Sequence, residues 1–383
     1  MSTAPATAAA RVPATRLVSL DVFRGATMAA MVLVNNPGDW GQVYAPLLHA
    51  EWHGWTPTDL IFPFFLFIVG VAMTLSRATL GPWGRILRRG ATIVGLGALL
   101  AGFPYYPLAT WRIPGVLVRI GIGYLAATAL FRWTLPSGAR DDRKHAVRLA
   151  WVAGLLVIGY WAAMVLAPYP GHLPGDLSKE GNLAAFIDRA VIGQAHMYRQ
   201  RGWDPEGLAS TLPAIGTILA GVITGFWLRA GVEARAKAAV LAAAGLALLA
   251  LGLLWDLAFP INKNLWTSSF VAFTGGAAAF SLAACYYLVD VLGWRWWTRP
   301  FVILGVNAIT LYVLAGLSAR LLGLIMVTGP EGTPISLQRF VYTSWFAPLA
   351  DPKNASLLYA CAYLAVLFVV LYGMYRKGIY IRA

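Results

Sequence analysis

The sequence predicts an all-α, polytopic membrane protein with about ten transmembrane helices. Three features of its composition lead to this prediction. Hydrophobic residues make up 59% of the 383-residue chain, charged residues make up only 12%, and the mean hydropathy is +0.65. A soluble domain carries about twice this share of charged residues, because its surface is in contact with water. At about 20 residues per crossing plus loops, roughly ten spans fit into the chain.

Ten apolar stretches follow one another along the chain. The hydrocarbon core offers no water to backbone N–H and C=O groups, so we expect each stretch to be a helix. The ninth is long enough to tilt or break. The predicted spans lie near residues 18–35, 58–76, 91–107, 113–131, 149–167, 209–228, 238–258, 266–289, 300–327 and 355–375.

The basic residues predict the orientation of the chain in the membrane. Lys and Arg are about twice as frequent in one alternate set of loops as in the other. Loops rich in Lys and Arg stay in the cytoplasm, so the bias places both termini there. It also accounts for the net charge of +14 without a nucleic-acid partner. We expect 1–15, which is small, polar and Pro-containing, to be a disordered cytoplasmic tail before one transmembrane domain over 16–383.

Polar residues gather at the predicted outer ends of the spans. Two outer loops, 36–57 and 168–208, are too long to be simple connections, and loops of this length tend to carry function or to be disordered. Polar residues at membrane ends are also ordinary helix caps. Carboxylates, amides, hydroxyls and aromatic rings on one face are nevertheless typical of a sugar site. The candidates are Asn35, His49, Asp59, Glu206, Asn262, Trp266 and Ser268.

Charged residues inside spans need a partner or a function. Asp21 and Arg24 share one helix face near the cytoplasmic end of the first span, either as an internal ion pair or as a cation offered to an anionic ligand. Arg119 lies within the fourth span, where a structural pair with another span is the alternative to a functional role. His, Cys, Asp and Glu show no metal-site spacing, and we expect no metal.

Six segments together resemble one family, the heparan-α-glucosaminide N-acetyltransferases and their bacterial homologues, within a wider group of transmembrane acyltransferases. The resemblance runs from about residue 16 to the C-terminus. The segments that carry it are 19–25 (SLDVFRG), 31–35 (MVLVN), 49–63 (HAEWHGWTPTDLIFP), 204–213 (DPEGLASTLP), 261–269 (INKNLWTSS) and 305–309 (GVNAI).

The resemblance implies an enzyme that takes acetyl-CoA from the cytoplasm and acetylates a glucosamine amine on the far side of the membrane. Its active histidine carries over to His49, and its asparagine at the end of the first span carries over to Asn35. The sequence departs from the lysosomal members, which have a large N-terminal luminal domain, and we therefore expect a bacterial inner-membrane relative. The inner-face cations Arg24, Arg88 and Arg89 are then expected to hold the phosphates of CoA.

The mechanism is left open between two routes. An amine must be neutral to attack a thioester, and His49 suits the role of base near neutral pH. Alternatively, His49 itself is acetylated and passes the group on. Asn35 would donate to the developing oxyanion, and Asp59 or Glu206 would orient the histidine or hold the acceptor.

Two other classes of protein compete with this hypothesis. Ten helices with intramembrane charges and an outer sugar-like site would also suit an amino-sugar permease, although no inverted repeat is found. A structural membrane protein leaves the intramembrane charges without an explanation. The expected partners are acetyl-CoA, an amino sugar and membrane lipid, and a homodimer is left open.

Overall fold

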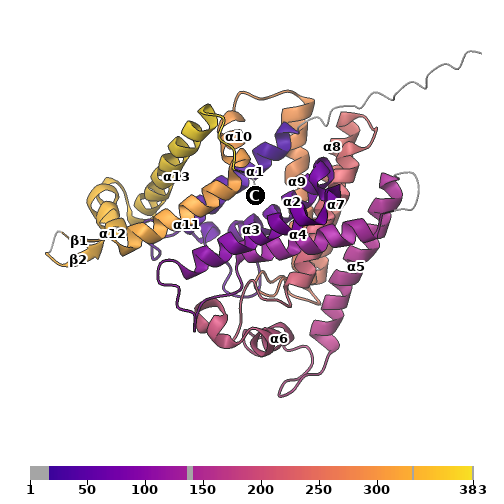
Figure 1. Cartoon of the computed structure of the whole chain (residues 1–383), viewed down its shortest axis with the longest axis horizontal. Helices are drawn as coiled ribbons and strands as arrows, with labels where there is room; N and C mark the ends of the chain where they lie inside the picture. The colour runs from indigo at the N-terminus through magenta and orange to yellow at the C-terminus, as the bar shows by residue number, and fades with distance from the viewer. Residues whose placement is uncertain (1–16, 136–140, 330–331, 382–383) are drawn as a thin grey trace, which may run out of the picture.

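Helices make up nearly all of the regular secondary structure in the described part of the chain (Figure 1). The computed structural model describes residues 17–135, 141–329 and 332–381, so the expected tail 1–15 lies outside the described residues. The α-helices are α1 (Val18–Asn35), α2 (Ile61–Leu75), α3 (Trp83–Gly102), α4 (Val116–Trp133), α5 (Asp142–Leu166), α6 (Leu183–Val191), α7 (Thr211–Arg229), α8 (Ala234–Asp256), α9 (Ser268–Tyr286), α10 (Arg299–Val306), α11 (Ala308–Leu324), α12 (Leu337–Val341) and α13 (Pro352–Arg376). Two three-residue strands, β1 (Met326–Thr328) and β2 (Pro334–Ser336), pair antiparallel.

The predicted all-α, multi-pass architecture is confirmed. In the described part of the chain, eight helices are long and apolar enough to cross a membrane, and a ninth span results if α10 and α11 are counted together. These two helices meet at an angle of 79°, so the ninth predicted span breaks. The remaining predicted span, 91–107, falls on α3, which begins at Trp83 and includes three arginines in its first turns.

Helix starts follow from local capping. The Asp141 side chain accepts hydrogen bonds from the backbone N–H groups of Arg143 and Lys144 at the start of α5. Asp351 caps α13 in the same way, and Pro352 takes the first helical position. Both acidic caps occupy free N–H groups that have no partner within the helix.

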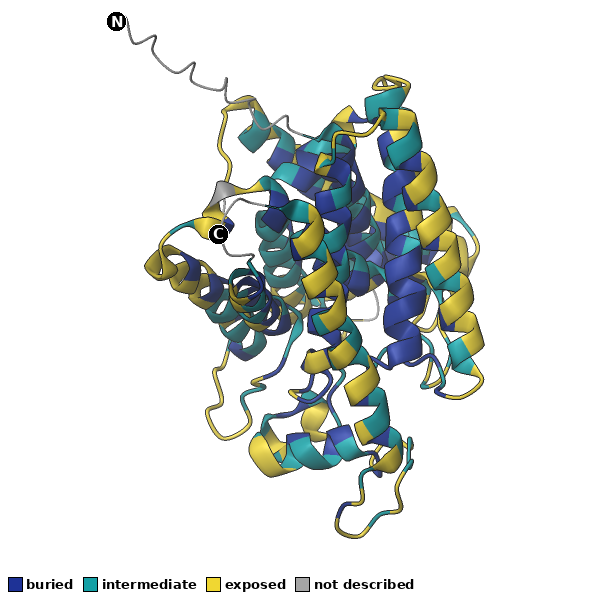
Figure 2. Cartoon of the chain, turned by 90° about the vertical axis from the view of Figure 1, so that its right-hand side faces the viewer, coloured by how far each residue is buried: buried dark blue, intermediate teal, exposed yellow. Residues whose placement is uncertain are grey.

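The helices divide into a buried centre and a lipid-facing periphery. In the most apolar stretches of α7 and α9, 78% and 72% of the residues are buried. In those of α5 and α8, only 17% and 22% are buried. Figure 2 shows long exposed stripes on the outer helices beside buried ones. Because the exposed residues of α5 and α8 are themselves mostly apolar, we assign these faces to the lipid.

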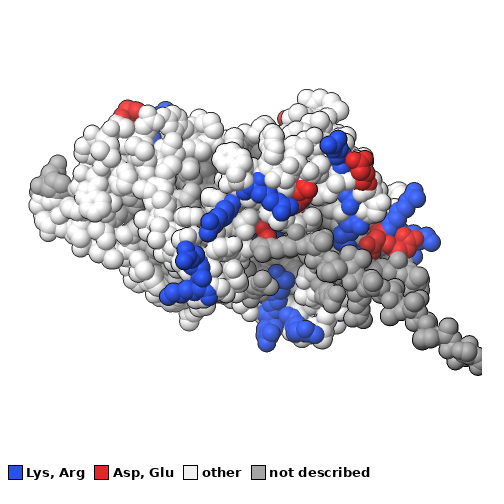
Figure 3. Space-filling model, turned by 90° about the horizontal axis from the view of Figure 1, so that it is seen from above, with Lys and Arg blue, Asp and Glu red and all other residues white. Residues whose placement is uncertain are grey.

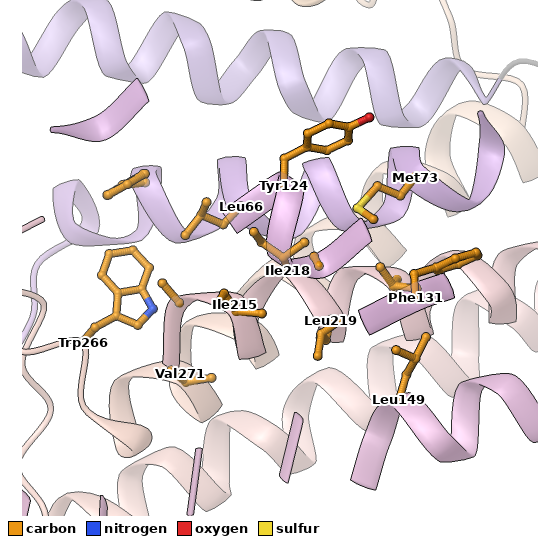
Figure 4. Packing of buried hydrophobic residues seen from close by; sticks show 14 of the residues in the cluster. Leu66, Met73, Tyr124, Phe131, Leu149, Ile215, Ile218, Leu219, Trp266 and Val271 are labelled. Carbon is orange, nitrogen blue, oxygen red and sulfur yellow. The ribbon is translucent and has the colours of Figure 1, made fainter. Parts of the chain in front are cut away.

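The largest core cluster joins α2, α4 and α7 (Figure 4). Leu66 of α2, Phe131 of α4 and Ile218 of α7 are almost fully buried in it. The backbones of α2 and α7 touch at two glycines. A Cβ added to Gly70 would lie 1.9 Å from the Ile218 carbonyl oxygen, and one added to Gly221 would lie 2.0 Å from the Phe67 carbonyl oxygen.

This contact gives the first prediction. The Gly221→Ala variant is expected to lose about 1–3 kcal/mol of unfolding free energy, because the new methyl group forces the two backbones apart. Thermal melting of the purified protein in detergent measures the loss. Gly154→Ala in α5 is the control, since a Cβ there meets nothing within 4 Å. Its melting temperature should not fall, and equal losses in both variants would contradict the close approach of α2 to α7.

The two long loops, 36–57 and 168–208, pack on each other at one end of the bundle, and we call this end the loop layer. The indole of Trp52 donates a hydrogen bond to the Leu177 carbonyl oxygen at 2.8 Å and lies edge-to-face with Trp203 at 5.0 Å. From the opposite end, α5 descends toward this loop layer, which contains α6 (Figure 1). That opposite end is seen face-on in Figure 3, with Lys and Arg side chains spread over it.

Candidate active site

The centre of the loop layer is a histidine–carboxylate pair. His49 Nδ1 lies 2.7 Å from Asp59 Oδ1. The His49 side chain is 50% exposed, whereas that of Asp59 is 1% exposed. A carboxylate at this distance accepts from Nδ1–H and leaves the lone pair on Nε2, which is the protonation state of a base. The sequence placed both residues at the site, and the structure brings them into contact.

Asp59 is held by the short 3₁₀ helix in which it lies, Pro57–Leu60. Thr56 and Asp59 form a reciprocal cap at its start. The other carboxylate oxygen, Oδ2, accepts from the backbone N–H groups of Ala50 and Thr56 at 3.0 and 3.1 Å and from the Thr56 hydroxyl at 3.2 Å. Three donors therefore fix Oδ2 and turn Oδ1 toward His49.

A lysine that was not among the predicted site residues completes the cluster. Lys263 Nζ lies 3.0 Å from His49 Nδ1, 3.3 Å from His49 Nε2 and 3.5 Å from Asp59 Oδ1. Burial lowers the pKa of Lys263, an effect that the charge of Asp59 opposes. The signal in the sequence was a lysine between two asparagines beside a tryptophan, which alone is not specific.

Lys263 is carried by a rigid turn. The Asn262 side-chain oxygen accepts from the Leu265 N–H at 2.9 Å, and the Asn262 N–H donates to the Thr267 hydroxyl at 3.0 Å. The Asn262 amide also lies 3.3 Å from His53 Nδ1. Burial lowers the pKa of His53. Asn262 is thus next to the cluster and fully buried, with its side chain engaged in supporting the turn.

Two further predicted acceptor-binding residues lie beneath this turn. Trp266 has a φ of +51° and is fully buried. Its ring packs on Phe62 and Phe270, and its indole N–H donates to the Thr217 hydroxyl at 3.2 Å. The hydroxyl of Ser268 donates to the Val157 carbonyl oxygen at 2.6 Å. In this structure both side chains are bound to neighbouring helices and stabilise the turn that carries Lys263.

Glu206 is engaged by an arginine. Arg112 donates to both oxygens of Asp204, at 3.0 and 2.6 Å, and to Glu206 at 2.5 Å. Burial opposes the charge of Arg112, but the two carboxylates outweigh it and raise the pKa of the guanidinium. Glu206 also acts electrostatically on Lys263. The predicted role of Glu206 in holding the acceptor would therefore be shared with Arg112.

Arg119 of α4 does not pair with Asp59. It is buried, and its guanidinium donates to the Gly207 carbonyl oxygen at 3.0 Å and to the Ser210 hydroxyl. It also lies 5.0 Å from the centre of the Trp266 ring. This arginine thus connects α4 to Trp266, in the turn that carries Lys263.

The other predicted residues lie apart from this cluster or have partners of their own. The Asn35 amide donates to the Met31 carbonyl oxygen of its own helix at 2.9 Å. Arg24 pairs with Asp21 at 3.0 Å. Arg88 is exposed, and Arg89 lies 5.0 Å from the centre of the Tyr124 ring.

Fold and site together define a multi-pass α-helical membrane protein with a histidine–carboxylate–lysine cluster in its loop layer. Residues 16–140 match the family model described as heparan-alpha-glucosaminide N-acetyltransferase, catalytic. His49 and Asp59 fall inside that match.

Full-length comparison extends the match. The heparan-alpha-glucosaminide N-acetyltransferase of Homo sapiens is 31% identical over 352 residues, which cover 78% of this chain and 52% of the relative. The enzyme of Mus musculus is 32% identical over 359 residues, covering 79% and 54%. The chain is thus related to the heparan-α-glucosaminide N-acetyltransferases, as its motifs indicated. It spans about half the length of these relatives.

Proposed function

We propose that this protein is a membrane N-acetyltransferase that moves the acetyl group of cytoplasmic acetyl-CoA to the amine of a glucosamine-containing acceptor on the outer side. The contact between His49 and Asp59 is the observation that supports it most. A half-exposed histidine oriented by a buried carboxylate is an arrangement suited to general-base catalysis. It also lies in the part of the chain that matches the catalytic family model.

In the proposed reaction His49 Nε2 accepts a proton from the acceptor amine while the amine attacks the thioester. Asp59 fixes the ring orientation and stabilises the imidazolium that forms. The route through an acetyl-histidine uses the same nitrogen as nucleophile. Trapping of labelled acetyl on the protein before acceptor is added would distinguish the two routes.

The donor is proposed to enter from the opposite, basic end. Arg24, Arg88 and Arg89 lie in α1 and α3 toward that end and would contact the phosphates of CoA. Guanidinium groups suit phosphate because their donors match its geometry. The pantetheine arm would then extend through the bundle toward His49, spanning roughly half to two-thirds of a ~30 Å hydrocarbon core. We place the protein in a bacterial inner membrane with both termini in the cytoplasm.

A permease for amino sugars is the second candidate. It is favoured by the break between α10 and α11, because interrupted helices are common at transport sites. A permease gives no role, however, to an oriented histidine in an outer loop.

Product analysis distinguishes the two functions. Purified protein in detergent is incubated with acetyl-CoA and glucosamine, and the products are identified by mass spectrometry. We expect N-acetylglucosamine and free CoA in equal amounts. Glucosamine binding without any acetylated product would favour the permease.

The proposed orientation gives the second prediction. In a variant whose native cysteines, Cys285 and Cys361, are replaced by alanine, single cysteines are introduced at Ala45 and Gly84. Both positions are exposed. In intact cells a membrane-impermeant maleimide should label position 45 and leave position 84 unlabelled until the membrane is opened. The reverse pattern would invert the topology and exclude the assigned donor and acceptor sides.

A further inference from the structure

Lys263 contacts both members of the His49–Asp59 pair, and it has no assigned role so far. Its backbone is fixed, because Ile261, Asn262, Leu265 and Trp266 are all buried and the Trp266 N–H donates to the Lys263 carbonyl oxygen at 3.2 Å. The side chain itself is 15% exposed. The backbone that carries Lys263 is rigid, and its side chain is mostly buried. The ammonium group is therefore positioned before a substrate binds.

The contacts of Lys263 differ from those of a lysine that only neutralises a carboxylate. In such a pair the carboxylate oxygen is the nearest acceptor. Here Nζ lies 3.5 Å from Asp59 Oδ1 but 3.0 and 3.3 Å from the two ring nitrogens of His49. The ammonium is therefore displaced from the carboxylate toward the imidazole ring, within 3.3 Å of both ring nitrogens.

The chemistry has to occur at Nε2. Since Asp59 occupies Nδ1, the reacting groups must approach the other ring nitrogen. A donor 3.3 Å from Nε2 lies within reach of an oxygen on the carbon that is being attacked. The amide of Asn35, the oxyanion donor expected from the sequence, donates one hydrogen bond to Met31 of its own helix.

We propose that Lys263 is a catalytic residue whose ammonium donates a hydrogen bond to the oxyanion of the acetyl-transfer intermediate. This inference rests on the proposed N-acetyltransferase function. As the amine nitrogen bonds to the thioester carbon, the carbonyl π pair moves to oxygen and Lys263 stabilises that charge. His49 Nε2 takes the amine proton. The carbonyl then reforms, the C–S bond breaks, and the leaving thiolate receives the proton from His49, giving an amide and CoA.

Variants of Lys263 test the assignment. Lys263→Met removes the charge and keeps most of the length of the side chain, whereas Lys263→Arg keeps the charge. Single-turnover transfer from acetyl-CoA to glucosamine should slow by about 100- to 1000-fold in Lys263→Met, the usual effect of losing one oxyanion donor. The KM for acetyl-CoA should stay within about threefold, because the contact forms in the transition state. Lys263→Arg should recover most of the rate.

A second acyl donor shows whether Lys263 acts in catalysis or only supports the fold. Fluoroacetyl-CoA has a more electron-poor carbonyl, whose oxyanion depends less on an external donor. If Lys263 acts on the oxyanion, Lys263→Met should lose at least tenfold less rate with fluoroacetyl-CoA than with acetyl-CoA. A merely structural lysine would give the same loss with both thioesters.

Lys353→Met is the matched control, since Lys353 is an exposed lysine that lies 5.9 Å from the Tyr44 ring centre. It should transfer acetyl at the wild-type rate. If the wild type is active and Lys263→Met stays within about threefold of it, or loses equally with both thioesters, the role of Lys263 is overturned while the proposed function stands. If the wild type forms no N-acetylglucosamine, the proposed function fails and the role of Lys263 fails with it.

Discussion

Replacement of His49 by alanine is expected to slow acetyl transfer by at least about 100-fold, the usual scale for loss of a general base. The protein should stay folded, because half of the His49 side chain is exposed and its removal leaves no cavity in the core. Binding of acetyl-CoA should be unchanged, since the donor is proposed to be held from the other end. Single-turnover transfer to glucosamine, measured beside a thermal melt, gives both quantities.

The chain contains a matched control for this variant. His172 also pairs with an aspartate, at 3.5 Å between His172 Nδ1 and Asp176 Oδ2, in the second outer loop. His172→Ala should therefore show what loss of a loop histidine–carboxylate pair does on its own, and we expect near-normal turnover. Equal losses in both variants, or normal turnover in His49→Ala, would remove the reason to assign His49 the catalytic role.

The Asp59→Asn variant is expected to lose between about 100- and 10,000-fold in transfer rate. Three donors point at the place of Oδ2, from Ala50 and Thr56, so the amide oxygen should occupy it. The NH2 group then faces His49 and forces Nδ1 to accept. The ring proton moves to Nε2, and the base is lost although the geometry is kept.

Stability distinguishes this variant from His49→Ala. Asparagine at position 59 leaves Lys263 beside no carboxylate, and breaking a buried ion pair costs about 3 kcal/mol or more. A lower melting temperature is therefore expected together with the loss of rate, which is measured well below the transition. Asp176→Asn serves as the control at the partly exposed pair with His172. An Asp59→Asn protein with wild-type rate would show that His49 does not need its carboxylate.

The spans could be predicted because a single physical cause produces them. Residues that face lipid or the helix core must be apolar, so hydropathy alone located the eight helices that could cross a membrane in the described part of the chain, and the bent pair of α10 and α11. The start of α3 was missed for the same reason. Arg85, Arg88 and Arg89 are helical, but their charge hides the helix from a hydropathy criterion. The strands β1 and β2 have three residues each, too few for a recognisable alternation of apolar and polar residues.

The break between α10 and α11 was expected only as a consequence of length. Its place depends on tertiary contacts. Asn307 is fully buried, its amide donates to the Ile379 carbonyl oxygen at 3.1 Å, and its side-chain oxygen accepts from the Ile381 N–H at 3.1 Å. Partners more than 70 residues away cannot be inferred from the local sequence.

The site was predicted in part for a similar reason. His49 and Asp59 lie ten residues apart in one motif; the resemblance indicated His49, and Asp59 was a candidate as a polar residue at the end of a predicted span. Lys263 comes from a segment more than 200 residues later, and only the folded loop layer brings it to the ring of His49. The exposure of a side chain is also hidden in the sequence. Trp266 was predicted to bind the acceptor, and the structure packs its ring in the core against other aromatic rings.

Transfer across a sealed membrane tests the central claim most directly. The protein is reconstituted in liposomes, with acetyl-labelled acetyl-CoA on the side of the termini and glucosamine on the other side. We expect labelled N-acetylglucosamine to accumulate on the glucosamine side while free CoA appears in equal amount on the donor side, and neither to form with His49→Ala. Passage of unmodified glucosamine across the membrane, with the acetyl-CoA left intact, would contradict the account.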